Sequence, residues 1–236
     1  LREACAQPAE GLFERTNLVA WCIVPFDDRE RTPQERATML AQLGIRKFAY
    51  DYRAQHIPTF DEELRALKEQ GVELTAWWFP TVLNEEARLI LEVLRRNNVR
   101  AQLWVTGGGA PTATPEEQAA RVAAEADRIG QIAFAAALQG CRVSLYNHGG
   151  WFGEPDNQMA IIEQLRTRGI ENVGIVYNQH HGHAHVDQFA ALLQRMLPYL
   201  DCLNLNGMVR NGDEQGLKIV PLGAGELDLP LLRIIA

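Results

Sequence analysis

The chain of 236 residues is poor in lysine and has no cluster of basic side chains. Its three lysines, Lys47, Lys68 and Lys218, are far apart in the sequence, the arginines are scattered, and the formal net charge is −7. Binding to the phosphates of DNA or RNA needs clustered positive charge, so a nucleic-acid partner is not expected. No apolar run approaches the ~20 residues that span a bilayer, which argues against a membrane role.

Cysteine is also sparse. Cys5, Cys22, Cys141 and Cys202 form no CxxC pair, which argues against a disulfide framework and against a zinc finger. Three of them lie in or beside predicted strands, where small buried side chains are expected. The chain begins at Leu1 rather than Met, which indicates upstream processing or trimming. The compartment is left open: a cytoplasmic location is favoured, with N-terminal processing or export as the alternative.

Seven short apolar runs recur along the chain, with helix-like segments between them. The runs are rich in β-branched or aromatic residues, as buried parallel strands are. They comprise residues 17–24, 47–52, 73–79, 100–105, 142–147, 172–178 and 202–206. This alternation predicts an α/β fold with a parallel sheet.

The expected helices have recognisable ends. Thr32, Thr59 and Thr114 are each followed three residues later by Glu, which is the capping-box pattern. Glycines follow four helical runs, where a left-handed residue ends a helix; these are Gly44, Gly71, Gly140 and Gly169. Three further helices are expected to begin at Asp156, near Asp187 and at Asp228.

The number of strand–helix units favours a closed barrel. The first strand-to-helix turn, residues 24–28, lacks the GxGxxG of open dinucleotide-binding sheets. A (β/α)8 TIM barrel therefore matches better, although an open sheet remains an alternative. Seven strands can be read, and the eighth is missing or lies beyond Ala236. We expect residues 1–236 to form a single barrel domain, with residues 1–16 as an N-terminal extension.

Four of the five tryptophans fall in or after the third, fourth and fifth predicted strands. Trp77 and Trp104 are expected in the core. Trp78 and Trp151 lie at loop junctions, where we expect them to line a pocket and to stack on a ring of the ligand.

Four asparagines, Asn147, Asn178, Asn204 and Asn206, fall at the ends of three consecutive predicted strands. The loops after the strands of a barrel build its site, so these amides are expected to share one face. Buried amides require hydrogen-bond partners, and a polyol or sugar would supply them. We therefore expect them to bind substrate hydroxyls.

Five of the six histidines follow two adjacent strands. His148, His180 and His181 are expected to contribute to function, because chance scatter does not favour this clustering. His183 and His185 are expected in the solvated start of the next helix. Histidine transfers protons near neutral pH and binds transition metals, so both kinds of site are considered.

Three charged residues are further candidates. Glu154 and Lys218 are lesser candidates for acid–base catalysis and for anion binding, respectively. Asp51 is one of the polar residues at the end of the second strand; the alternative interpretation is a surface charge that pairs with Arg53 or Lys47.

Three stretches resemble the xylose isomerase-like TIM barrel family, which includes sugar phosphate isomerases and epimerases and the endonuclease IV relatives. They are residues 145–151 (LYNHGGW), 173–181 and 220–226 (VPLGAGE), and the resemblance extends from Leu18 onward. It implies a divalent metal at the barrel mouth, bound by carboxylates and a histidine. It also implies transfer of a proton next to a carbonyl by two glutamates.

The match departs from the family pattern at the carboxylates. The family's strand-five Glu falls at Tyr146, its strand-six Asp at Asn178 and the following His at His181. Its strand-seven His falls at Asn204 or Asn206. Neutral amides are poor replacements for anionic ligands of hard cations.

The resemblance leaves two kinds of altered site as alternatives. In the first, His148 and His181, with His180 as a further candidate ligand, would bind a transition metal such as Zn, Mn or Co. Otherwise there is no cofactor, and His148 and His181 act as acid and base alone.

The sequence therefore predicts a sugar isomerase/epimerase-like protein that acts on a carbohydrate or sugar acid by proton transfer. The alternative is a non-catalytic sugar-binding barrel that has lost its metal. An endonuclease IV-like enzyme is disfavoured by the acidic charge and the missing ligands. A homo-oligomer is left open.

Overall fold

The structure is a computed structural model and describes residues 11–236. Cys5 and the first ten residues of the expected N-terminal extension lie outside the described residues. The chain divides into two compact units, one formed by the residues up to Leu74 together with Leu229–Ala236, the other by Thr75–Asp228. Single-domain organisation stays a prediction.

The first unit contains two parallel strands, β1 (Val19–Ala20) and β2 (Lys47–Tyr50), with Val19 opposite Lys47. Its helical segments are η1 (Arg15–Asn17), α1 (Pro33–Gln42), η2 (Ala54–Thr59) and α2 (Phe60–Glu69), and most of α8 (Asp228–Ile235) belongs to it. Helices α1 and α2 are joined by a buried ion pair, in which Arg36 donates two hydrogen bonds of 3.0 and 2.7 Å to Glu63.

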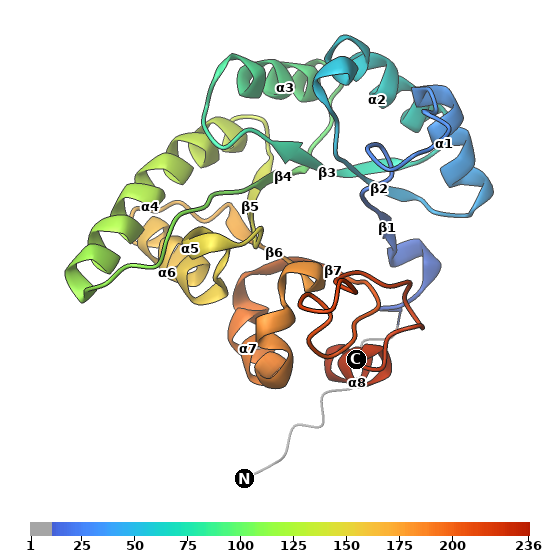
Figure 1. The fold of residues 1–236 in the computed structure, drawn as a ribbon. Coiled ribbons are helices and arrows are strands. Elements are labelled where there is room, and N and C mark those ends of the chain that lie inside the picture. Colours follow the sequence, from blue (N-terminus) through green and yellow to red (C-terminus); the bar gives the residue numbers. More distant parts are fainter. Residues whose placement is uncertain (1–10) are drawn as a thin grey trace, which may run out of the picture. The chain divides into compact units, whose positions relative to one another are not determined.

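The second unit contains five strands that pair in parallel and in chain order. They are β3 (Glu73–Phe79), β4 (Gln102–Val105), β5 (Arg142–Tyr146), β6 (Val173–Asn178) and β7 (Leu200–Asn204). Its helices are α3 (Glu85–Arg96), α4 (Pro115–Ala137), α5 (Gly150–Gly153), α6 (Pro155–Arg166) and α7 (Phe189–Met196). Three 3-10 segments complete it, η3 (Gln179–His181), η4 (His183–Gln188) and η5 (Leu197–Tyr199). Figure 1 shows α3, α4, α6 and α7 along the outer side of these strands.

The core of the second unit lies on both faces of its strands. Trp77 and Trp104 are at most 1% exposed, which confirms their expected place in the core. All six residues of β6 are buried. A parallel strand that is covered on both faces has such a continuous apolar run, because neither face meets solvent.

The helix starts follow the predicted caps at two of three sites. Thr32 and Glu35 form the complete capping box of α1, and Thr114 accepts a hydrogen bond from the Glu117 amide at the start of α4. The predicted cap at Thr59 is wrong. The Thr59 hydroxyl donates to the His56 carbonyl instead, because residues 54–59 already form a 3-10 turn. The first strand is also shorter than predicted, and Cys22 beyond it has a φ of 56°.

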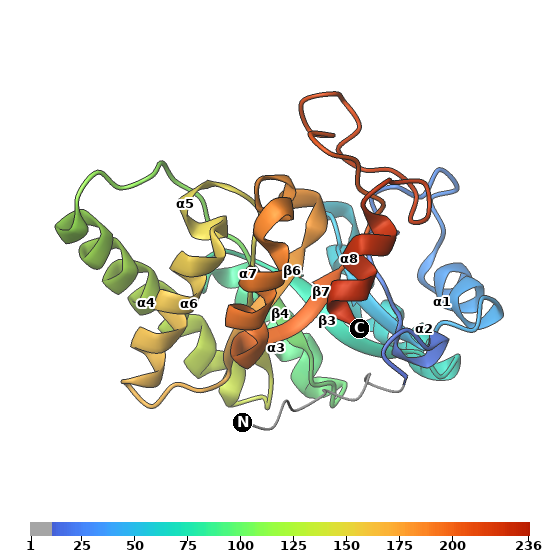
Figure 2. The ribbon, with the colours of Figure 1, turned by 90° about the horizontal axis from the view of Figure 1, so that it is seen from below.

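The loops after β4, β6 and β7 lie at the same edge of the second unit (Figure 2). Residues 207–228 follow β7 without regular helix until α8 begins. The Asp228 carboxylate accepts hydrogen bonds from the amides of Met208, Gly223 and Gly225, so it joins the two ends of this segment. Within residues 11–236, no helix is long and apolar enough to cross a membrane.

Candidate functional site

Four rings form a cluster at the carboxyl ends of β3, β5 and β6. The rings of His148 and His181 lie 4.5 Å apart, measured between centroids. Tyr146 lies 6.0 Å from His148 and 5.9 Å from His181. Trp78 approaches Tyr146 edge-on at 5.2 Å and His148 at 6.0 Å. The structure thus brings together three predicted site residues, and we call Trp78, Tyr146, His148 and His181 the ring cluster.

Asparagine side chains fix the backbone beneath the ring cluster. Asn147 is 1% exposed; its amide donates to the Asn178 carbonyl at 3.0 Å, and its side-chain oxygen accepts from the Asn178 backbone at 2.7 Å. The Asn178 side chain donates to the Tyr146 hydroxyl and accepts from the His180 backbone amide. These contacts give Asn147 and Asn178 a structural role in addition to the predicted substrate role, which stays a prediction.

Of the histidines after β6, His180 and His181 have lowered pKa values. The rings of His180 and His181 stack 4.2 Å apart with an interplanar angle of 19°. Burial, followed by the positive charge of Lys218, lowers the pKa of His180 to about 4. Burial, then His180, His148 and Lys218, lower the pKa of His181 to about 3. Both imidazoles are therefore neutral at pH 7 and able to accept hydrogen bonds or protons.

The expectation of a solvated loop at His183 and His185 is wrong. His185 is buried, and its ring bridges the Tyr177 hydroxyl at 3.2 Å and the Glu154 carboxylate at 3.1 Å. The His183 ring lies 2.9 Å from the carbonyl oxygen of Lys218. Glu154 and Lys218 are both exposed, and both contact this segment rather than the ring cluster.

The remaining predicted residues lie apart from the ring contacts. Trp151 is 3% exposed, and its indole donates to Gln118 at 2.7 Å while Arg121 covers its ring, so its face is not open for stacking on a ligand. Asn204 and Asn206 are half-buried at the end of β7, each with one side-chain polar atom that has no hydrogen-bond partner among the described residues.

The donor set does not fit a metal held by carboxylates. Tyr146 and Asn178, which the sequence resemblance aligns with acidic ligands, are hydrogen-bonded to each other. Among residues 11–236, no group of three or more His, Cys, Asp or Glu side chains is arranged to bind a metal ion. A transition metal bound by His148 and His181 stays a proposal.

Sequence patterns did not predict that Tyr146 and Tyr177 contribute to the site. Both end or nearly end buried strands, β5 and β6, and both place a hydroxyl beside a side chain from another element. The available signal was a tyrosine at or near the end of a buried strand, because a buried hydroxyl requires a partner.

A buried carboxyl group follows β2 in the first unit. Asp51 is 2% exposed, so the expectation of a surface charge paired with Arg53 or Lys47 is wrong. The Arg53 guanidinium instead donates to the carbonyls of Asp51 and Tyr52. Burial raises the pKa of Asp51 to about 7, although Arg53, the amide of Val24 and the thiol of Cys22 act in the opposite direction.

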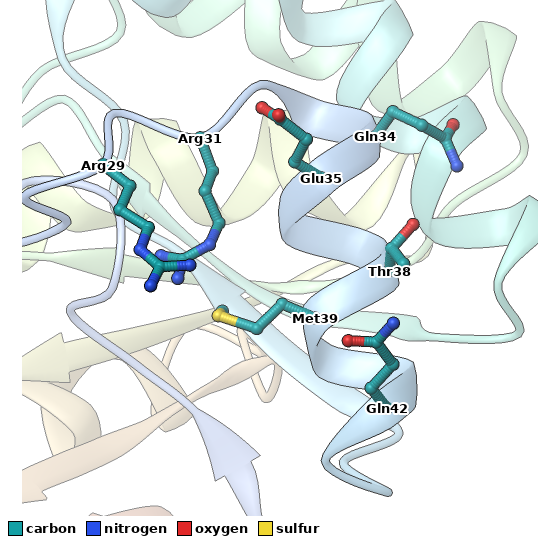
Figure 3. A pocket seen from close by; sticks show the side chains of 7 residues that line it. All are labelled: Arg29, Arg31, Gln34, Glu35, Thr38, Met39 and Gln42. Carbon is teal, nitrogen blue, oxygen red and sulfur yellow. The ribbon is translucent and has the colours of Figure 1, made fainter.

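The first unit also has an open pocket of about 480 Å³ on the outer face of α1. Figure 3 shows the guanidinium groups of Arg29 and Arg31 near Met39, and the polar side chains of Gln34, Thr38 and Gln42 along α1 on the side away from them. Arg31 is ion-paired with Asp27. None of the predicted site residues lines this pocket, so it does not contribute to the candidate site.

Comparison with known proteins relates the chain to sugar-converting barrels by structure alone. No protein-family model and no curated protein sequence matches it. The 3-keto-D-glucoside 4-epimerase of E. coli superposes with a TM-score of 0.62 at 17% identity, covering 92% of this chain and 85% of the epimerase. A xylose isomerase domain protein of Alicyclobacillus acidocaldarius superposes with a TM-score of 0.61 at 17% identity, covering 87% of this chain and 81% of that protein. The D-allulose 3-epimerase of a Methylomonas species, in complex with D-allulose, superposes with a TM-score of 0.59 at 14% identity. The superposition covers 86% of this chain and 75% of the epimerase.

These similarities confirm the predicted architecture. Seven parallel strands alternate with helices along the chain, and proteins of the same topology are α/β barrels. At such low identity the comparison establishes the fold only. The protein has an α/β-barrel fold like that of these solved structures.

Proposed function

We propose that the protein is sugar isomerase/epimerase-like and binds a polyhydroxylated sugar or sugar acid at the carboxyl ends of β3, β5, β6 and β7. The observation that supports this most is the ring cluster. Trp78 and Tyr146 offer aromatic surfaces against which a sugar ring packs, and two imidazoles lie beside them. The solved structures support the substrate class, because two of them are sugar epimerases and one contains D-allulose.

Isomerisation next to a carbonyl requires one group that removes a proton and one that returns a proton at a neighbouring atom. We assign these roles to His148 and His181, whose ring centroids lie 4.5 Å apart, so that both would act from the same side of the substrate. His181 is neutral at pH 7, which is the form that accepts a proton. Its low pKa also makes it a weak base, since a general base works best with a pKa near the operating pH.

Sugar binding without turnover is the second candidate. Two observations favour it: the low pKa of His181, and the hydrogen bond between Tyr146 and Asn178 at positions where the related family has acidic metal ligands. Binding of Zn, Mn or Co by His148 and His181 is a separate proposal. Metal analysis of the purified protein tests it, and the proton-transfer roles of His148 and His181 do not depend on it.

The experiment has two stages. Thermal-shift screening with neutral and acidic sugars, and with nucleotides as the contrast, identifies a ligand. NMR in D2O then measures exchange of the ligand's C–H protons. We expect His181→Asn to abolish exchange or weaken binding, whereas Gln188→Ala, an exposed position in the same segment, leaves both unchanged. Binding without exchange favours the second candidate, and stabilisation by nucleotides alone contradicts both.

A further inference from the structure

The carboxyl ends of β6 and β7 contain N–H donors without acceptors. The side-chain nitrogens of Gln179 and Asn204 are buried, and within residues 11–236 neither has a hydrogen-bond partner. Gln179 is 4% exposed and directly follows Asn178, which pairs with Asn204 across β6 and β7. Unsatisfied buried donors are rare in folded proteins, so two of them at neighbouring strand ends point to an acceptor from outside the chain.

A lysine brings positive charge to the same edge. The Lys218 carbonyl oxygen lies 2.9 Å from a ring nitrogen of His183, which places the lysine beside the histidine segment. Its side chain is exposed and forms no hydrogen bond or ion pair with any described residue. Two carboxylates contact residues 179–188, and both face a histidine instead of Lys218. Glu154 lies against His185, and Asp213 lies against His183.

We propose that the ligand of this site has an acidic oxygen group, a carboxylate or a phosphate, that pairs with Lys218 and accepts hydrogen bonds from Gln179 and Asn204. The inference rests on the proposed function and specifies it: the substrate is a sugar acid or a phosphorylated sugar rather than a neutral sugar. An oxyanion has enough lone pairs to accept from several N–H donors at once, and charge-assisted hydrogen bonds are about twice as strong as neutral ones.

Matched probes test the proposal. Gluconate and glucitol have the same carbon chain and differ in one carboxylate, and glucitol 6-phosphate supplies the phosphate arm. We expect calorimetric titration to show about tenfold tighter binding of one acidic probe than of glucitol. The preference should decrease at high salt, because Lys218 is exposed. Lys218→Gln should remove the preference, whereas Lys68→Gln, an exposed lysine of α2, should keep it.

The outcomes separate this inference from the proposed function. Equal binding of gluconate and glucitol, or a preference that persists in Lys218→Gln, overturns the acidic ligand and leaves sugar binding intact. Binding of acetate or inorganic phosphate that depends on Lys218, without binding of any polyol, supports the anion site and contradicts the sugar function. No detectable binding of any acidic probe overturns the inference. Circular dichroism of each variant verifies that it is folded.

Discussion

The side-chain amide of Asn178 donates a hydrogen bond to the hydroxyl of Tyr146, and this contact joins strand β6 to strand β5 below the ring cluster. The sequence resemblance described above aligns both positions with acidic metal ligands, whereas this pair is neutral. The pair does not supply the negative charge that hard divalent ions favour.

Restoring both acids should restore metal affinity. In Tyr146→Glu/Asn178→Asp, two carboxylates lie beside His181, and we expect Mn²⁺ to bind at least about tenfold more tightly than to the unaltered protein. Isothermal titration with Mn²⁺ measures this, with Tyr146→Glu alone as the control. Unchanged affinity in the double variant would show that other substitutions prevent metal binding.

The buried ion pair between α1 and α2 should contribute strongly to stability. Glu63→Ala leaves the Arg36 guanidinium, which is 2% exposed, without its anionic partner. Removing one partner of a buried pair costs about 3–5 kcal/mol. Urea unfolding measures the change. Glu92→Ala, which breaks the exposed pair with Arg95, should leave the unfolding midpoint unchanged; similar effects of both substitutions would contradict the prediction.

Asp51 should make stability decrease as the pH rises through the weakly acidic range. Burial raises its pKa from 3.8 to about 7, so the folded state retains a proton that the unfolded chain releases. Below pH 3.8 both states are protonated and there is no penalty. Between pH 4 and 7 the penalty grows to at most about 4 kcal/mol, and above pH 7 it is constant. The groups that face this carboxyl are Cys22, Arg53 and Tyr50.

Unfolding of Asp51→Asn as a function of pH checks this expectation. The variant should lose the decrease in stability between pH 4 and 7 relative to the unaltered protein. Asp28→Asn, at an exposed position of the first unit, should retain it. A parallel pH dependence of the Asp51 variant and the unaltered protein would mean that other groups cause the decrease.

The Glu154–His185–Tyr177 contacts should hold residues 179–188 in place. His185 links the exposed Glu154 to the buried Tyr177 hydroxyl, and a Cβ at Gly182 would lie 2.2 Å from that hydroxyl. Glu154→Gln removes the charge from one hydrogen bond. We expect amide exchange of the segment to increase roughly tenfold, as loss of a charge-assisted bond predicts. Asp156→Asn, which affects only the exposed pair with Arg195, serves as the control in exchange mass spectrometry.

Local signals in the sequence predicted the architecture well. Strand β6 is a continuous apolar run, and α1 begins with a capping box and is followed by Gly44 with a φ of 71°. Such features depend on residues near in sequence, so they can be read without the fold. The cap at Thr59 failed because a 3-10 turn, whose hydrogen bonds are equally local, competes for the same residues.

The site was less predictable because its contacts join distant residues. His183 and His185 resemble a solvated loop until Lys218 and Glu154, 35 and 31 residues away, are placed beside them. The burial of Asp51 had a weak signal, its position directly after a buried strand. Proximity of His148 and His181 was predictable, because β5 and β6 are neighbours and the carboxyl ends of parallel strands meet at one edge.

The three amide hydrogen bonds to Asp228 have a consequence for engineering. Because one carboxylate joins Met208 to Gly223 and Gly225, the ends of the intervening segment are fixed independently of its length. Closing a longer loop between fixed ends costs only about 0.6 kcal/mol for each doubling of its length. A peptide tag or a small folded module inserted between Glu214 and Gln215, two exposed residues, should therefore be tolerated. This makes the loop tip an attachment point for a fluorescent reporter of ligand binding.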